Sequence, residues 1–208
     1  MEYRLDLNNL HKILELARNY DSKLLPVIKG RDEEEILQIY DEGLREFGEN
    51  RLNELLDHKR FLPEASFHFI APLQSRKIPQ IMDNCDFIHT LQRSKEILNI
   101  NECYQNQDIF VQINIDDDPN KSGIQINEVD NFFDKFEGLK YFPVGIMCIP
   151  SFDSDPKNSF SKMSKINEKL KKNFNDYKGE LSMGMSGDYK IALDYGATII
   201  RIGSKIFN

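Results

Sequence analysis

The sequence has few cysteines, no long hydrophobic run and no surplus of positive charge, and each shortage excludes a class of protein. Its three cysteines are widely spaced and form no CxxC pair, which argues against a disulfide framework or a zinc site and fits a reducing cytoplasm. His11, His58 and His89 lack metal-ligand spacing and are expected to be ordinary core or surface residues. The apolar runs are too short to cross a bilayer, and the first residues lack a secretory signal. With a net charge of -7, we expect a cytoplasmic protein with no membrane segment, no metal and no nucleic-acid partner.

The chain has 208 residues, of which 40% are hydrophobic and 29% are charged. This mixture is typical of a globular protein rather than a disordered one. The length suits one large domain, and no internal repeat or low-complexity linker divides it. We therefore expect residues 1–208 to form a single domain. We also expect a monomer, because no sustained heptad pattern indicates assembly.

Short β-branched or aromatic runs alternate with stretches whose apolar residues recur three and four positions apart. The first pattern predicts strands and the second predicts amphipathic helices. The expected strands are residues 24–29, 46–50, 67–73, 87–91, 108–115, 143–149, 181–186 and 198–207. The expected helices are residues 8–20, 34–44, 51–61, 77–84, 94–104, 127–136, 159–174 and 188–195.

Eight strands separated by helices predict parallel pairing with right-handed crossovers, and eight such units close a barrel. The expected fold class is therefore α/β, a single (β/α)8 TIM barrel. A doubly wound open sheet is the alternative, and it usually carries a GxGxxG turn after its first strand. The turn in this chain, Lys29-Gly30-Arg31-Asp32, lacks that motif.

Two glycine- and serine-containing turns mark the ends of the last two strands. In such barrels the active site lies at the carboxyl ends of the strands, and phosphate is often held by the loops after strands seven and eight. Ser186-Gly187-Asp188 and Gly203-Ser204 occupy those places, and free backbone N–H groups in such turns can bind an anion. Helix capping is the alternative for Ser186-Gly187-Asp188, but the pair of turns favours a phosphate site.

An arginine within an apolar strand and a lysine at a strand end complete the candidate site. Arg201 shares the strand face of Gly203 and is expected to line the same pocket, with a structural ion pair as the alternative. Lys29 ends the first strand. Most lysines are solvated surface residues, but an amine at a barrel mouth facing a phosphate site is what a Schiff base with a phosphorylated aldehyde requires.

These residues, in this order, resemble the pyridoxal phosphate homeostasis proteins (the YggS/PROSC family), whose fold resembles a stand-alone alanine-racemase-type barrel. The resemblance extends over nearly the whole chain from residue 24. The matching segments are Val27–Lys29, Phe47–Asn50, His68–Lys77, Lys121–Gly123, Gly145–Pro150, Ser182–Asp188 and Ile200–Phe207.

This resemblance implies a site for pyridoxal 5′-phosphate (PLP). The residues that it implies around the cofactor are Lys29, Asn50, His68, Met185, Ser186, Arg201, Gly203 and Ser204. Among them, Lys29 would form a Schiff base with the cofactor. Ser186, Gly203 and Ser204 would hold the phosphate and Arg201 would face the pyridine nitrogen, while the remaining three would lie beside the ring.

The same residues indicate binding rather than catalysis. Arg201 can only donate hydrogen bonds, so it should favour the unprotonated pyridine nitrogen and a weaker electron sink. Racemisation needs two opposed bases around Cα, and Lys29 is the one obvious base here. We therefore expect a PLP carrier in intracellular vitamin B6 and amino-acid homeostasis, with little or no catalysis and no catalytic residue. Amino acids and apo-enzymes that use PLP are further expected partners.

Two alternative functions stay open on the sequence. The first is a PLP-dependent amino-acid racemase, which would turn over L-alanine or L-serine in a manner that depends on Lys29. The second is a barrel enzyme that acts on a phosphorylated metabolite without PLP. It predicts a protein that stays colourless when PLP is added.

Overall fold

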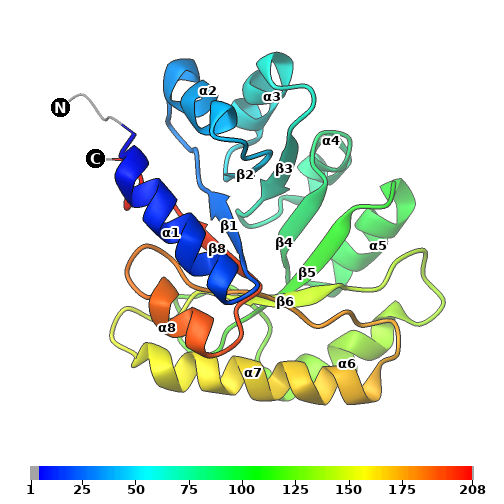
Figure 1. Ribbon diagram of the computed structural model, residues 1–208. Coiled ribbons are helices and arrows are strands. Elements are labelled where there is room, and N and C mark those ends of the chain that lie inside the picture. Colours follow the sequence, from blue (N-terminus) through cyan, green and yellow to red (C-terminus); the bar gives the residue numbers. More distant parts are fainter. Residues whose placement is uncertain (1–4, 208) are drawn as a thin grey trace.

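The computed structural model describes residues 5–207, which form a parallel β-barrel surrounded by helices (Figure 1). The strands are β1 Lys23–Pro26, β2 Glu46–Glu49, β3 Ser66–Phe69, β4 Phe87–Leu91, β5 Asp108–Ile113, β6 Gly145–Cys148, β7 Glu180–Ser182 and β8 Ile199–Ile202. The α-helices are α1 Leu7–Asn19, α2 Glu33–Asp41, α3 Leu52–Phe61, α4 Ile78–Met82, α5 Ser94–Cys103, α6 Val129–Phe133, α7 Pro156–Asn173 and α8 Tyr189–Asp194.

The strands follow one another around the barrel in the order β1-β8-β7-β6-β5-β4-β3-β2, and each neighbouring pair is parallel. The two ends of this sheet, β1 and β2, meet through a single bridge between Val27 and Gly48. There the Ile28 N–H donates to the Gly48 carbonyl at 3.1 Å. The expected (β/α)8 barrel is therefore confirmed, and the alternative of a doubly wound open sheet is wrong.

Apolar side chains fill the barrel and the space between its strands and helices. The core inside the barrel consists of Leu25, Phe110, Val144, Met147 and Ile199. A larger core lies between the strands and the helices. Because side chains alternate along a strand, Arg201, two positions after Ile199, and Gln112, two positions after Phe110, also face the barrel interior.

Seven of the eight strands end earlier than the sequence pattern predicts, and at β1, β2, β7 and β8 the correction moves a site residue out of the strand. β1 ends at Pro26, and Lys29 lies in a turn that the Arg31 N–H closes on the Ile28 carbonyl at 3.1 Å. β8 ends at Ile202, because the Gly203 carbonyl accepts a hydrogen bond from Ile206 N–H at 3.0 Å. β7 similarly ends at Ser182, so residues 183–186 are irregular.

Caps on two helices hold the loops at the carboxyl end of the barrel. The Asp6 side chain caps α1, and its backbone N–H donates to the Ile206 carbonyl at 2.8 Å, which ties α1 to the turn after β8. At α2, Asp32 and Glu35 form a capping box directly after the Lys29 turn. Such reciprocal bonds satisfy N–H groups that a helix start leaves without partners.

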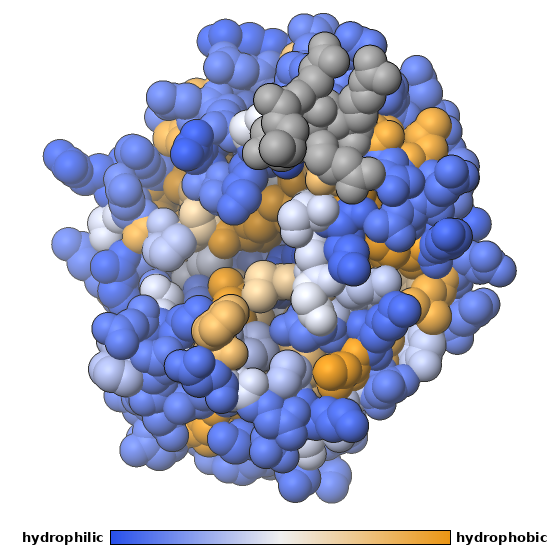
Figure 2. Space-filling view, turned by 90° about the vertical axis from the view of Figure 1, so that its left-hand side faces the viewer, coloured by the Kyte–Doolittle hydropathy of each residue, from blue (hydrophilic) through white to orange (hydrophobic). Residues whose placement is uncertain are grey.

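The surface of the described chain is mainly polar. Figure 2 shows a face on which hydrophilic residues predominate and apolar residues form small separate groups. The large apolar side chains exposed along residues 5–207 are Leu7, Tyr20, Leu37, Leu98 and Phe152. In this same part of the chain, no helix is both long enough and apolar enough to span a membrane.

Candidate functional site

The barrel topology brings the ends of β1, β8 and β7 together. Leu25 of β1 lies beside Arg201 of β8, and the Val27 N–H donates to the Ile202 carbonyl at 2.8 Å. On the other side, the Arg201 N–H donates to the Gly184 carbonyl at 2.9 Å. The lysine, the arginine and both serine-containing turns predicted from the sequence therefore belong to three adjacent strands.

The turns after β7 and β8 form a rim of backbone N–H groups, which we call the amide rim: Ser186, Gly187, Gly203 and Ser204. Within residues 5–207 these four N–H groups have no hydrogen-bond acceptor. The Ser186 hydroxyl oxygen accepts from the Lys205 N–H at 3.3 Å, which links the two turns. Unpaired N–H groups on adjacent turns, where glycine leaves the backbone open, suit an oxyanion such as phosphate.

Helix capping does not account for the first of these turns. Asp188 occupies the N-cap position of α8, but its side chain makes no capping hydrogen bond to that helix. Its Oδ1 instead accepts from the Met185 N–H at 2.6 Å, which closes the turn itself. The capping alternative from the sequence is wrong for this aspartate.

Arg201 is buried, with 4% of its surface exposed, and it has no carboxylate partner within the described chain. Its two terminal nitrogens donate to the Ser182 hydroxyl at 2.7 Å and to the Cys148 carbonyl at 2.9 Å. Burial lowers the pKa of Arg201, but from so high a value that the guanidinium stays charged. A buried cation held only by neutral acceptors favours an anionic or hydrogen-bond-accepting ligand, and the structural ion pair considered above is absent from residues 5–207.

A chain of buried polar side chains continues from Arg201 through the barrel interior; we call it the buried relay: Arg201, Ser182, His89, His68 and Glu46. Ser182 Oγ lies 2.8 Å from His89 Nδ1, and His89 Nε2 lies 2.9 Å from His68 Nδ1. His68 Nε2 lies 3.2 Å from Glu46 Oε2. The relay therefore runs across β8, β7, β4, β3 and β2.

The relay has a defined charge state. Burial lowers the pKa of His89 well below its usual value, and burial also lowers the pKa of His68 against the opposing effect of Glu46. The hydrogen bond with His68 lowers the pKa of Glu46 to about 2. At neutral pH the two rings are accordingly neutral, and Glu46 is a carboxylate.

The other sequence-predicted residues lie around the same end of the barrel. Lys29 is exposed, and its ammonium has no hydrogen bond or ion pair to residues 5–207. Asn50 is half-buried, and its Oδ1 is buried without a partner. It lines a groove of about 620 Å³ that also reaches Gln74 and Lys77. Met185 is half-buried beside the amide rim.

Three members of the relay, His89, Ser182 and Glu46, are not among the site residues that the sequence predicts. The sequence predicts an ordinary histidine at position 89 and places His68 beside the ring. Both nitrogens of His68 are in fact engaged by His89 and Glu46. A usable signal was present, because His68 lies between Phe67 and Phe69 and His89 follows Ile88, so alternation along two neighbouring strands turns both rings away from these outer-core residues and into the barrel.

No cluster of three or more histidine, cysteine, aspartate or glutamate side chains in residues 5–207 has the geometry of a metal site. The acidic segment Asp116–Asp118 is instead tied into its own loop: Asp116 Oδ2 accepts from Ser151 N–H at 2.8 Å, and Asp118 Oδ2 accepts from the Ser151 hydroxyl at 2.9 Å. The chemistry of this end of the barrel therefore rests on the lysine, the arginine and the amide rim.

The family model described as the alanine racemase N-terminal domain matches residues 7–208. Among curated proteins, the pyridoxal phosphate homeostasis protein of Pasteurella multocida is 33% identical, and the match covers 96% of this chain and 92% of that protein.

Solved structures show the same fold. PipY of Synechococcus elongatus, without PLP, superposes with a TM-score of 0.89 at 25% identity, covering 97% of this chain and 99% of that one. The PLP-bound form of PipY gives a TM-score of 0.84 at 23% identity, covering 96% and 100%. Alanine racemase of Corynebacterium glutamicum gives 0.76 at 12% identity, covering 98% of this chain but 61% of the racemase, so that protein shares the barrel and has further chain beyond it.

Proposed function

Because the chain belongs to the alanine racemase N-terminal domain family, and within it to the pyridoxal phosphate homeostasis proteins, we propose that it binds pyridoxal 5′-phosphate as a Schiff base on Lys29. The observation that carries this proposal is the buried guanidinium of Arg201, which lacks a carboxylate partner in the described chain and lies below the amide rim. The name of the relatives supports a role in PLP and amino-acid homeostasis.

The residues present fit the cofactor group by group. The phosphate suits the four unpaired N–H groups of the amide rim and the hydroxyls of Ser186 and Ser204. The pyridine nitrogen suits Arg201, which offers N–H donors and the one buried positive charge among these groups. Asn50 Oδ1 is a buried acceptor without a partner at the same end of the barrel, and with Met185 we assign it to the side of the ring.

Lys29 supplies the covalent link. Its neutral amine would be the nucleophile toward the aldehyde carbon, with one water molecule released as the C=N bond forms. The lysine is free for this step because its amine has no ion-pair partner within residues 5–207 and is open to solvent. Gly30 follows it with a φ of +67°, and the Gly30 N–H donates to Glu54 Oε2 at 2.9 Å. This turn fixes the backbone from which the lysine extends.

The same geometry favours holding the cofactor over using it. PLP acts as an electron sink for reactions at the Cα of amino acids, most strongly when its ring nitrogen is protonated. Arg201 donates and cannot accept, so it would favour an unprotonated nitrogen in a bound cofactor. A racemase also needs a second base opposite Lys29, and we assign no residue to that role. We therefore infer a carrier with little or no catalysis, in preference to the racemase alternative.

Absorption spectroscopy and peptide mapping test the binding proposal directly. Purified protein mixed with PLP should gain the visible absorption band of a protonated Schiff base. Borohydride reduction followed by proteolysis should then place the label on the peptide that contains Lys29. A protein that stays colourless, or a label spread over Lys77, Lys190 and Lys205, would contradict the proposal and favour a barrel that acts on a phosphorylated metabolite without PLP.

The absence of racemisation is a separate prediction. PLP-loaded protein incubated with L-alanine or L-serine should leave the enantiomer unchanged, because we assign no residue of the described chain as a second base opposite Lys29. Chiral chromatography measures the outcome, with the loaded Lys29→Ala variant as control. Steady formation of the D-enantiomer that requires Lys29 would establish the racemase alternative.

The remaining assignments follow the same proposal. We assign His68 to the layer below the ring, since its two nitrogens are already used in the buried relay.

We further propose that residues 1–208 act as one domain and as a monomer in the cytoplasm. Amino acids and apo-enzymes that use PLP are the partners to which the held cofactor would pass.

A further inference from the structure

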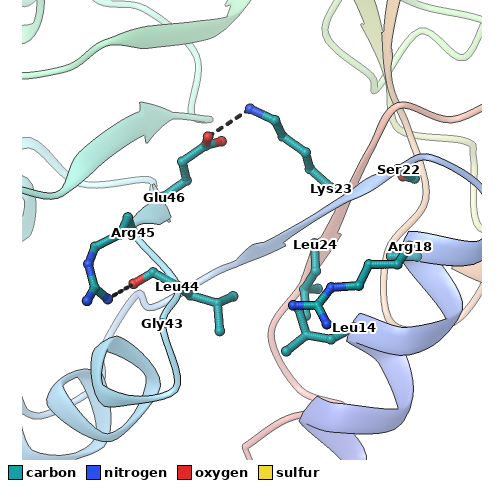
Figure 3. Close-up of a pocket in the computed structure, with 10 residues that line it drawn as sticks. Leu14, Arg18, Ser22, Lys23, Leu24, Gly43, Leu44, Arg45 and Glu46 are labelled. Carbon is teal, nitrogen blue, oxygen red and sulfur yellow. Dashed lines mark hydrogen bonds and ion pairs between the residues drawn. The ribbon is translucent and has the colours of Figure 1, made fainter.

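The buried relay connects Arg201 with the opposite end of the barrel. Its last member, Glu46, is the first residue of β2, and its Oε1 pairs with the Lys23 ammonium at 2.7 Å. Lys23 is the first residue of β1. Figure 3 shows the two side chains reaching toward each other from their strands, beside a pocket of about 370 Å³ that also contains Leu24 and Arg45. The relay thus begins under the proposed cofactor site and ends at the far surface.

The hydrogen-bonding capacities of its two ends fix the direction of the whole chain. A guanidinium has only donors, so Arg201 must donate to Ser182. An ionised carboxylate has only acceptors, so Glu46 must accept from His68 Nε2. Each neutral imidazole has one donor and one acceptor. His68 therefore accepts at Nδ1 from His89 Nε2, and His89 accepts at Nδ1 from the Ser182 hydroxyl.

This arrangement determines both tautomers. His68 and His89 must each carry their hydrogen on Nε2. The Ser182 hydroxyl must point its hydrogen at His89, which turns its lone pairs toward Arg201. Packing holds the rings in place for these bonds: His68 stacks on Phe87 with ring centres 3.8 Å apart, and His89 stacks on Phe110 at 4.4 Å. The side chains of Ser182, His89 and His68 can therefore form all of their hydrogen bonds in the relay in only one donor-to-acceptor order.

We propose that Glu46 is a positioning residue for Arg201: its carboxylate selects the Nε2–H tautomer of His68 and His89 and so directs the Ser182 lone pairs that hold the guanidinium. The tautomer selection stands on the relay alone, while its effect on the cofactor rests on the proposed function. Glu46 is partly exposed, so the orientation of a buried group under the cofactor is set from the far surface of the barrel.

The Glu46→Gln variant tests the proposal because an amide has the same shape as a carboxylate but can donate as well as accept. When the introduced amide donates to His68 Nε2, the bonds of the two histidines are reversed and each ring carries its hydrogen on Nδ1, while the Ser182 oxygen accepts from both His89 and Arg201. Long-range ¹H–¹⁵N spectra of the PLP-free protein report which ring nitrogen is protonated. We expect Nε2–H alone for both rings in the unaltered protein, and a shift of the His68 Nδ1 signal toward the protonated range in Glu46→Gln.

The matched control is Lys23→Met, which removes the outer cation but keeps the carboxylate, and it should leave both tautomers unchanged. Nδ1–H rings or doubly protonated rings in the unaltered protein at pH 7 would overturn the proposal. So would a Glu46→Gln spectrum identical to that of the unaltered protein.

PLP-loaded protein supplies the second readout. Glu46→Gln should shift the absorption band of the bound cofactor and release PLP about fivefold faster, the effect of weakening one hydrogen bond, while Lys29 stays the labelled residue. Lys23→Met should match the unaltered protein in both respects. If the tautomers change in Glu46→Gln but its absorption band and its rate of PLP release equal those of the unaltered protein, the relay does not affect the cofactor and that part of the proposal is wrong. If Lys29 is not labelled in any variant, the proposed function fails and the tautomer result stands.

Discussion

Replacing Lys29 with alanine is expected to abolish covalent retention of PLP. The methyl group of alanine cannot form a C=N bond, so the visible absorption band should be absent and borohydride should attach no label. Contacts to the amide rim and to Arg201 would remain, so reversible binding should persist but be weaker by about a hundredfold, which corresponds to about 2.7 kcal/mol. Gel filtration followed by absorption measurement gives the retained fraction, and equilibrium dialysis gives the affinity.

Lys205→Ala is the matched control for this result. Lys205 is exposed and directly follows the Gly203-Ser204 turn, so its amine is the rival closest in sequence to the amide rim. This variant should keep the absorption band and the labelled Lys29 peptide. If Lys29→Ala kept all of the reducible adduct and Lys205→Ala lost it, the Schiff base would form on Lys205. That result would contradict our proposal.

Lowering the pH from 7 to 5 is expected to destabilise the fold steeply because His68 and His89 are buried as neutral rings. Burial lowers the pKa of both histidines in the folded protein, whereas in the unfolded chain they take up protons below a pH of about 6.5. Between the folded and unfolded pKa values the unfolded state binds more protons, so the free energy of unfolding falls as the pH falls. The free energy of unfolding therefore changes by at most about 1.4 kcal/mol per pH unit for each histidine, and by about 2.7 kcal/mol per pH unit for the two together.

Two carboxyl groups modify this slope in opposite directions. The pKa of Glu46, lowered to about 2, adds a further loss of stability as the pH falls from the unfolded value of 4.5 toward 2. Burial raises the pKa of Glu49 against the opposing hydrogen bond from His58, so its protonation favours the folded state as the pH falls. The region between pH 6.5 and 5 is therefore where the histidines can be measured most cleanly.

Urea unfolding at pH 7, 6 and 5 measures the effect. A folded His89→Asn variant should lose about half of the slope, whereas His11→Gln should keep it because the His11 ring is exposed. An unfolding free energy that stays constant between pH 7 and pH 5 in the unaltered protein would show that the two rings are not neutral and buried as described.

The architecture was predictable from the sequence because local patterns encode it. The β-branched runs and the helical periodicities gave eight alternating units, and strand 87–91 agrees with β4 at both ends. Arg201 within an apolar strand was a reliable sign of a special environment, since a guanidinium cannot lose its charge. The serine- and glycine-containing turns were likewise found from their place after the last two strands.

The strand ends and the relay could not be predicted in the same way. Lys29 and Gly203 continue apolar runs in the sequence, and only the hydrogen bonds of the turns show that the strands end before them. The relay joins His68 to His89 across 21 positions and His89 to Ser182 across 93 positions. The first contact depends on the register of the neighbouring strands β3 and β4, and the second crosses the interior from β4 to β7 and depends on closure of the barrel, which no single segment specifies.

A single bridge between Val27 and Gly48 closes the seam between β1 and β2 in the barrel wall. β1 pairs with β8 through four residues, so separating β1 from β2 costs less than separating β1 from β8. Lys29 and the Gly203-Ser204 turn sit on one side of the seam, and Asn50 sits on the other. Transient separation of β1 from β2 would widen the opening of the pocket, while Lys29 and the Gly203-Ser204 turn would move together. A second small molecule would then reach the cofactor ring while the cofactor stays bound.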